Sequence, residues 1–228
     1  MSKIVHPYAH RLPLVRGWRS RWFRTGADYR DTLRADTMIR EWLEKKLRTS
    51  YISSIDFERN SKTLKILIAT ARPGMVIGRS GEGIETLKKS LVSFMKRAKI
   101  ETKEQMTIDI VEVKNPEADA AIMAYTIAES LEKRLPFRRV MKQAIEKIMA
   151  ARGVKGAKIV LSGRLGGADM SRREEIKLGG IPLQFMRGDI DFARDTARMT
   201  YGGIGIKVWI YRGDTLLAPK QAPVNSGK

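Results

Sequence analysis

The stretch Val76-Ile77-Gly78-Arg79-Ser80-Gly81 decides the fold of this chain. An apolar pair leads into a Gly-x-x-Gly bracket that holds one basic residue. Glycine has no Cβ atom, so a backbone with this pattern can approach a phosphodiester strand closely. Apolar residues at helical spacing follow the bracket, so exposed N–H groups and one cation would meet at a helix start. Such a turn is typical of domains that clamp single-stranded nucleic acid.

The charge of the whole chain indicates the same kind of partner. Its 228 residues include 44 Lys and Arg against 25 Asp and Glu, a formal net charge of +19. This excess predicts a polyanionic partner, with nucleic acid ahead of an anionic membrane surface. The chain has no cysteine, which excludes disulfides, thiol catalysis and cysteine metal sites. The sequence shows no membrane-spanning run and no secretory signal, so we expect a cytoplasmic or organelle-matrix protein with no membrane partner.

The segments around the glycine bracket follow a recognisable order. They are a helix from Asp36, strands over 51–58 and 64–68, a helical turn before Gly78, a helix over 84–99 and a strand over 106–110. This order is the arrangement of the type II KH domain, a three-stranded sheet with helices on one face. We predict that domain over residues 36–114, after a basic N-terminal arm over 1–35.

The remainder of the chain changes from helices to strands. Asn115-Pro116-Glu117 reads as a helix start with Asn115 as its N-cap, and Pro136 ends that helix. The next elements are a helix over 137–151, strands over 157–162, 170–178, 189–201 and 204–211, and a glycine-rich loop over 163–167. Helices followed by strands predict a second α+β domain over 115–213 with a mostly antiparallel sheet, and a disordered tail over 214–228.

Basic residues gather at several places where RNA could bind. The KH-turn candidates are Gly78, Arg79, Ser80 and Gly81. Arg138, Arg139 and Lys142 share one side of the predicted helix over 137–151, opposite its apolar stripe. That side is either a phosphate-binding surface or a solvated helix face. Further candidates for phosphate contact are Arg16, Arg19, Arg21, Arg24, Lys155, Lys158, Arg164, Arg172 and Arg173.

The sequence offers little for catalysis. Both histidines, His6 and His10, lie in the arm, and we interpret them as polar arm residues or phosphate contacts. Asp189 and Asp191 share a strand face and could in principle hold a divalent metal. Cross-strand ion pairs are the favoured interpretation because three arginines are near in sequence, Arg187, Arg194 and Arg198. We therefore expect no catalytic residue, no metal and no cofactor, and a metal-dependent nuclease using the two aspartates is the third hypothesis.

Several long blocks resemble one protein family. They are TARPGMVIGR over 70–79, NPE over 115–117, FRRVMK over 137–142, SGRLGGA over 162–168 and YGGIGIKVWI over 201–210. In this order, across nearly the whole chain, they are similar to the family of bacterial-type small-subunit ribosomal protein three. The resemblance implies a structural rRNA-binding protein of the small-subunit head, in the cytoplasmic ribosome, that is not an enzyme. It also implies that the protein lines the tunnel where mRNA enters.

The resemblance further implies partners and a role for one site. Family members bind small-subunit rRNA and mRNA, and they neighbour small-subunit proteins ten and fourteen, with proteins four and five near the tunnel. The positions Arg138, Arg139 and Lys142 match the element credited with helping to unwind structured mRNA. The arm departs from the family, since it reads HPYAHRL over 6–12 in place of an NPIGFRL-like segment. The alternative hypothesis is a free-standing KH-domain regulator of RNA, which would not sediment with small subunits.

Overall fold

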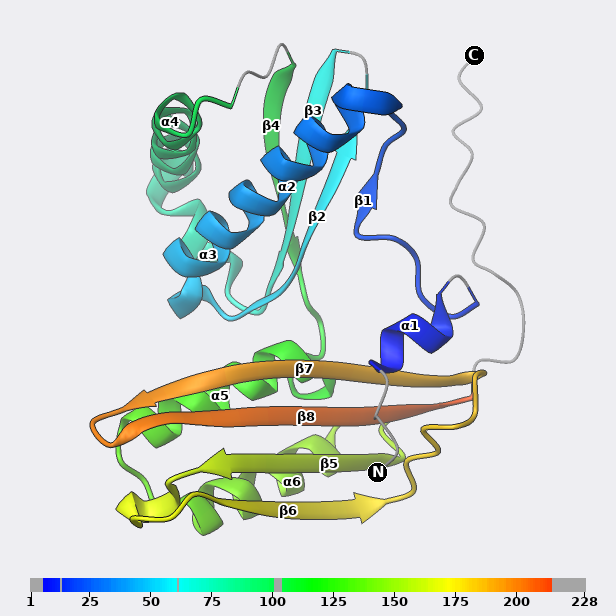
Figure 1. Ribbon diagram of the computed structural model, residues 1–228, viewed down its shortest axis with the longest axis vertical. Helices are drawn as coiled ribbons and strands as arrows, with labels where there is room; N and C mark the ends of the chain where they lie inside the picture. The colour runs from blue at the N-terminus through cyan, green and yellow to red at the C-terminus, as the bar shows by residue number, and fades with distance from the viewer. Residues whose placement is uncertain (1–5, 13, 61, 101–103, 215–228) are drawn as a thin grey trace. The chain divides into compact units, whose positions relative to one another are not determined.

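The chain forms two compact units in the computed structural model, which describes residues 6–12, 14–60, 62–100 and 104–214 (Figure 1). Arg19–Pro116 make up one unit, which we call the KH unit. Residues up to Trp18 join the part of the chain from Glu117 onward in the other, the C-terminal unit. The segment 1–35, expected as a single arm, is thus divided between the two units. The tail predicted over 214–228 lies outside the described residues except for Asp214, which ends a strand.

A four-stranded sheet forms the base of the KH unit, in the order β1 (Ser20–Arg21), β2 (Ile52–Arg59), β3 (Thr63–Thr70) and β4 (Gln105–Glu112). Strands β2 and β3 are antiparallel, whereas β4 runs parallel to β3. Ile66 of β3 lies opposite Phe57 and Ile108, so alternate residues of all three predicted strands share the core face. The two residues of β1 add a fourth strand parallel to β2, which two residues of sequence were too short to indicate.

The helices of the KH unit pack on one face of this sheet. They are α2 (Gly26–Lys46), η1 (Arg48–Ser50), α3 (Pro73–Ile77), η2 (Arg79–Gly81) and α4 (Glu82–Arg97). Helix α2 begins well before Asp36, where we predicted its start. Its first turns are exposed and therefore carry no apolar stripe for periodicity to detect. Asp36 is a buried residue inside the helix, and its carboxylate accepts hydrogen bonds from Trp22 and Arg59.

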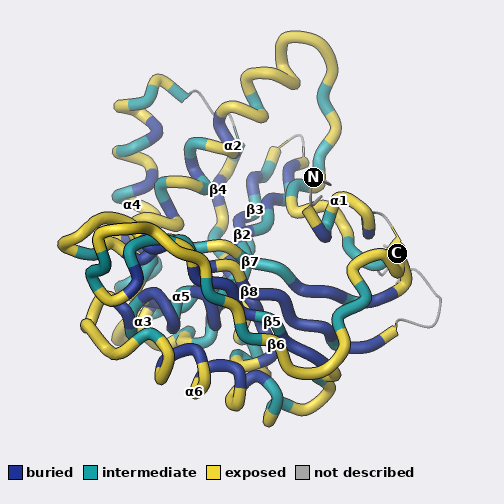
Figure 2. The backbone as a smooth tube through the Cα atoms, turned by 60° about the horizontal axis from the view of Figure 1, so that its bottom comes forward, coloured by how far each residue is buried: buried dark blue, intermediate teal, exposed yellow. Residues whose placement is uncertain are grey.

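The C-terminal unit is built on a second sheet of four strands, with every neighbouring pair antiparallel. Their order is β6 (Arg172–Gly179), β5 (Gly156–Gly163), β8 (Gly202–Asp214) and β7 (Gly188–Met199). Helices α5 (Ala120–Glu132) and α6 (Phe137–Ala150) cover one face, behind the strands in Figure 1. Figure 2 shows the central strands β5 and β8 mostly buried. A short turn, η4 (Leu165–Gly167), occupies the predicted glycine-rich loop.

The start of α5 differs from the prediction. Asn115 is not its cap: Pro116–Ala118 form a short 3-10 turn, and the N-cap is Asp119. The Asp119 carboxylate accepts hydrogen bonds from the N–H groups of Ala121 and Ile122, at 2.9 and 3.2 Å. The Ala120 N–H donates to Asp191 of β7 at 2.9 Å. A contact with a distant strand therefore helps to select the cap, and local sequence could not show it.

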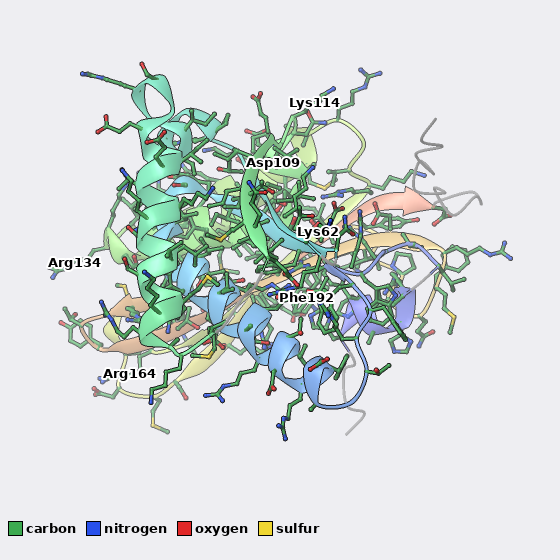
Figure 3. The ribbon with its side chains drawn as sticks, turned by 90° about the horizontal axis from the view of Figure 1, so that it is seen from above. Lys62, Asp109, Lys114, Arg134, Arg164 and Phe192 are labelled. Carbon is green, nitrogen blue, oxygen red and sulfur yellow. The ribbon has the colours of Figure 1, made fainter. Side chains whose placement is uncertain are left out.

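The arm contributes a short helix, α1 (Pro7–Arg11), to the C-terminal unit. The ring of His6 lies edge-on to Phe192, with 4.8 Å between ring centroids, and Phe192 is labelled in Figure 3. Arg11 is fully buried and donates hydrogen bonds to the backbone carbonyls of Gly188 and Phe185, at 2.7 and 3.0 Å. These residues are thus part of the folded unit. No described helix is both long and apolar enough to cross a bilayer.

Candidate nucleic-acid interface

The glycine bracket forms the turn between α3 and α4. Gly78 and Gly81 have φ of +72° and +83°, and Ser80 between them is also left-handed at +51°. A Cβ atom on Gly78 would lie 2.9 Å from the backbone nitrogen of Gly83, and one on Gly83 would lie 2.6 Å from the carbonyl oxygen of Val76. Two glycines therefore permit the close approach of α3 and α4. Gly83 is needed for this approach, although it was not among our predicted site residues.

The tip of the KH turn combines one cation with two acids. The side chains of Arg79 and Ser80 are exposed. Gly81 is the N-cap of α4 and has no side chain, so it provides no side-chain acceptor for the first N–H groups of the helix. Glu82 and Glu85 lie in the first turn, where the helix dipole favours them. A phosphate could be held by Arg79 and backbone amides, but the two carboxylates would weaken its binding.

The predicted basic face of α6 is present and exposed. Arg138, Arg139 and Lys142 face solvent, whereas Met141 and Ile145 on the opposite side are each 1 % exposed. The Arg138 side chain is 76 % exposed, with one nitrogen 3.7 Å from a carboxylate oxygen of Glu174. Among the described residues, no acidic side chain pairs with Arg139 or Lys142. The buried stripe holds the helix in place and leaves its cations available.

Three of the predicted arginines lie against two aromatic rings beside this helix. The guanidinium carbons of Arg138 and Arg172 lie 5.7 and 5.4 Å from the centre of the Phe137 ring. Arg164, labelled in Figure 3, lies 5.8 Å from the centre of the Tyr201 ring. These distances suit cation–π contacts. The structure therefore brings together α6, the glycine-rich turn and the start of β6.

Other predicted basic residues lie elsewhere or are engaged in ion pairs. Lys158 and Arg173 share Glu175 as an acidic partner, at 3.0 and 3.1 Å, on the sheet face away from the helices. The hydrogen bond from Lys158 holds the pKa of Glu175 below its usual value. Lys155 is exposed at the other end of β5, near Gly213. These three residues do not join the cluster around Phe137.

The arm arginines act largely within their own units. Arg16 pairs with Asp189 at 2.8 Å, Arg21 with Glu58 at 2.9 Å, and Arg24 with Glu104 at 3.1 Å. The side chain of Arg19 is exposed, and its carbonyl accepts a hydrogen bond from the N–H of Phe57 at 2.8 Å. Because three of the four are already paired, RNA would have to compete with these carboxylates.

The predicted partners of Asp189 and Asp191 were wrong. Neither pairs with Arg187, Arg194 or Arg198; Arg16 reaches both carboxylates, and Arg212 lies 2.9 Å from Asp191. Asp191 alternates along β7 with Ala193 and Ala197 of the helix-covered core, so its side chain lies on that face and meets the start of α5. Burial by itself would raise the pKa of Asp191, but Arg16 and Arg212 outweigh it and hold that pKa below its usual value. Among the described residues, no group of three His, Asp or Glu is placed to hold a metal.

The fold and its basic surfaces define an RNA-binding protein built from a KH domain and an α+β unit. The model of the KH domain matches residues 38–118, and that of the C-terminal domain of ribosomal protein S3 matches residues 127–210. Small ribosomal subunit protein uS3 of Clostridium botulinum (strain Alaska E43 / Type E3) is 45 % identical over 220 residues, which cover 96 % of each chain. The uS3 of Caldicellulosiruptor saccharolyticus is 46 % identical over 216 residues, covering 95 % of this chain and 94 % of the relative.

The chain belongs to the uS3 family of small-subunit ribosomal proteins. This membership confirms the predicted family and the predicted fold class, an α+β protein with an N-terminal KH domain. It supports a structural, RNA-binding role in the small subunit rather than an enzymatic one. The expected location, the cytoplasmic ribosome, follows from the same relatives.

Proposed function

We propose that this chain lies in the head of the small subunit, lines the tunnel where mRNA enters, and uses the basic face of α6 to guide mRNA and help unwind it. The exposed row of Arg138, Arg139 and Lys142 on a helix anchored by its buried stripe is the observation that carries this proposal. Fixed cations attract the backbone of a single strand without base preference, because every nucleotide carries the same phosphate. When a duplex in the mRNA opens beside these cations, they would bind a released single strand and so favour the unwound state.

The proposal includes specific partners. They are the small-subunit rRNA, mRNA, proteins ten and fourteen of the head, and proteins four and five near the tunnel. The cluster of Arg138, Arg164 and Arg172 around Phe137 and Tyr201 supports a site for RNA beside α6, since aromatic rings and guanidinium groups both stack on bases. A free-standing KH regulator would need no such neighbours.

Co-sedimentation separates the proposed role from that alternative. A tagged copy of the chain, expressed in cells, should be found with small subunits and with whole ribosomes in a sucrose gradient at moderate salt. Recovery only in the unbound fractions at the top of the gradient would favour the free-standing regulator. Chemical cross-linking of the bound fraction would then identify which small-subunit proteins are neighbours.

The combined replacement of Arg138, Arg139 and Lys142 by alanine tests the mRNA role. Ribosomes with this variant should slow markedly on an mRNA with a stable hairpin but little on an unstructured one, because three cations that hold the emerging strand are gone. Folding should survive, since the buried stripe of α6 is unchanged. The measurement is the elongation rate on the two templates with purified mutant ribosomes.

A matched control removes three exposed lysines from another helix, Lys88, Lys89 and Lys96 of α4. It changes the net charge equally and should leave the difference between the two templates as in the wild type. Equal slowing of the α6 variant on both templates would indicate an assembly defect. If neither template is translated more slowly, the basic face of α6 is a solvated surface that does not contact mRNA.

The KH turn is tested by replacing Arg79 and Ser80 together with aspartate. RNA affinity of the free protein should fall by about tenfold, a loss of about 1.4 kcal/mol, because the tip would then carry four acids and no cation. Thermal stability should stay unchanged, since both side chains are exposed and aspartate tolerates the left-handed backbone at position 80. The control, Arg79→Lys with Ser80→Asn, keeps the charge. An unchanged affinity of the aspartate variant would make the turn a scaffold only.

A further inference from the structure

One face of the C-terminal sheet is not used by the proposed function. It is the face opposite α5 and α6, and it has an apolar and a basic part. Val160, Ile190, Trp209 and Tyr211 form the apolar cluster, with Ile181 and Phe192 packed against it. His6 of the arm lies on Phe192, so this end of the face is covered by the chain itself.

The strand register places the basic part beside that cluster. On β5, Lys158, Val160 and Ser162 alternate with residues of the helix-covered core and so point to the other face. Residues directly opposite each other across a sheet lie on the same face. The cations that share this face are Lys158 of β5, Arg173 and Lys177 of β6, Lys207 of β8, and Arg194 and Arg198 of β7. We call these six residues the open sheet face.

The open sheet face carries more positive charge than the acidic side chains around it neutralise. Glu175 pairs with Lys158 and Arg173. Within the described part of the chain, no acidic side chain pairs with the other four cations, Lys177, Arg194, Arg198 and Lys207, all of which are exposed. Unbalanced cations fixed on a rigid sheet are suited to binding a polyanion.

The shape of this surface suits a phosphodiester backbone. Ser162, Gly205 and Thr196 form one row across β5, β8 and β7. These residues are small, and a Cβ atom on Gly205 would lie 3.0 Å from the Ser162 hydroxyl. Along this row the side chains project little from the sheet, whereas the longer lysine and arginine side chains beside it project further. Strand geometry separates Arg194 from Arg198 by about 13 Å along β7, and β6 from β7 by about 14 Å across the sheet.

The side chains of this face favour double-stranded over single-stranded RNA as its ligand. Four-stranded sheets that bind single strands do so through exposed aromatic rings on which bases stack. Here Trp209 is 6 % exposed and Phe192 lies beneath His6, so the described part of this face offers cations and small residues but no open ring. Duplex RNA, by contrast, is recognised mainly by shape and phosphate contacts.

We propose that the open sheet face binds the phosphate backbone of double-stranded RNA without reading its bases. The inference rests on the RNA-binding role of this chain but not on the role of α6 at the mRNA tunnel. The open sheet face would be a second RNA-binding surface, for double-stranded RNA, in addition to the face of α6 that we propose for single strands.

The test compares two triple variants of the full-length chain. The first replaces Arg194, Arg198 and Lys207 by alanine, and the second replaces Arg138, Arg139 and Lys142 by alanine, so that both lose the same charge. Each is titrated with a perfect RNA duplex of about 16 base pairs and with a single strand of equal length, at several salt concentrations. Thermal melting confirms that both variants are folded.

The sheet variant should bind the duplex at least about tenfold more weakly than the wild type, and the negative slope of log K against log salt should become shallower by about 2–3. Its affinity for the single strand should change much less. The proposal is overturned if duplex affinity and slope stay at wild-type values, or if the two variants lose duplex and single-strand affinity equally, which would reflect net charge alone.

The open sheet face could instead bind another protein. Measuring how much of each variant is incorporated into small subunits tests this alternative. A sheet variant that binds the duplex normally but no longer joins the subunit would overturn the RNA proposal in favour of a protein partner. The α6 variant reports on the proposed function separately, because its defect should appear on structured mRNA and not on the duplex.

Discussion

Replacing Arg59 by methionine is expected to destabilise the KH unit by about 3–5 kcal/mol. The Arg59 side chain is only 4 % exposed; its Nε lies 2.9 Å from a carboxylate oxygen of Asp36, and its Nη1 lies 2.8 Å from one of Glu104. Both acids are buried as well, at 1 % and 8 % exposure. Methionine fills the space but leaves the buried Asp36 carboxylate without a cation and Glu104 with Arg24 as its remaining partner. A loss of this size is a large part of the stability of an ordinary domain.

Hydrogen exchange gives the cleanest measurement, because it reports each unit separately. Protection of β2, β3 and β4 should decrease, while that of β5 and β8 stays unchanged. The matched control is Arg21→Met, which removes an exposed pair with Glu58 and should cost at most about 1 kcal/mol. A second variant adds Asp36→Asn and Glu104→Gln to Arg59→Met, and it should recover part of the loss. If the single variant costs no more than the control, the buried triad contributes nothing beyond a surface pair.

Replacing Asp191 by asparagine is expected to destabilise the C-terminal unit by about 3 kcal/mol and to loosen the attachment of the arm. The buried carboxylate of Asp191 accepts hydrogen bonds from the Tyr8 hydroxyl and the Ala120 N–H and pairs with Arg16 and Arg212. Asparagine keeps the shape but removes the charge that both arginines face. Residues 6–18 would then be held mainly by Arg11 and by the Arg16–Asp189 pair.

Acid pH should remove the stabilisation that the Asp191 carboxylate gives the wild type. The folded-state pKa of Asp191 lies below its usual value, so the stabilisation is fully present above the unfolded value of about 3.9 and is lost as pH falls toward the folded pKa. The difference in unfolding free energy between wild type and Asp191→Asn should therefore be constant above about pH 5 and shrink below about pH 4. Urea titrations over this range measure it.

The control for the acid experiment is Asp169→Asn, which changes a fully exposed carboxylate beside Arg164. It should leave the free energy of unfolding nearly unchanged, because water screens an ion pair on the surface. Limited proteolysis with trypsin supplies a second readout, since a loosened arm opens more often and exposes the bonds after Arg11 and Arg16. A difference that does not depend on pH, or an arm that stays protected in the variant, would contradict the assigned role of Asp191.

Features that depend on neighbours along the chain could be predicted from the sequence. The bracket from Gly78 to Gly81 requires left-handed backbone at two glycines, and the helices and strands around it follow from apolar spacing, so the KH order was predictable. The basic face of α6 was predictable for the same reason, because a helix separates its two faces by a period that the sequence itself carries. The long blocks shared with a known family supported both.

Pairing between distant residues was decided only by the tertiary structure. Asp191 meets Arg16 and Arg212 rather than the arginines nearest in sequence, and Asp36 is buried inside α2 against Arg59. The open sheet face likewise exists only because the register of β5 to β8 sets cations from four strands side by side. A charge interacts through space with whatever the fold brings within a few ångströms. The sequence therefore determined which residues form helices and strands, and the packing of those elements determined which charges are neutralised inside the protein and which stay available to RNA.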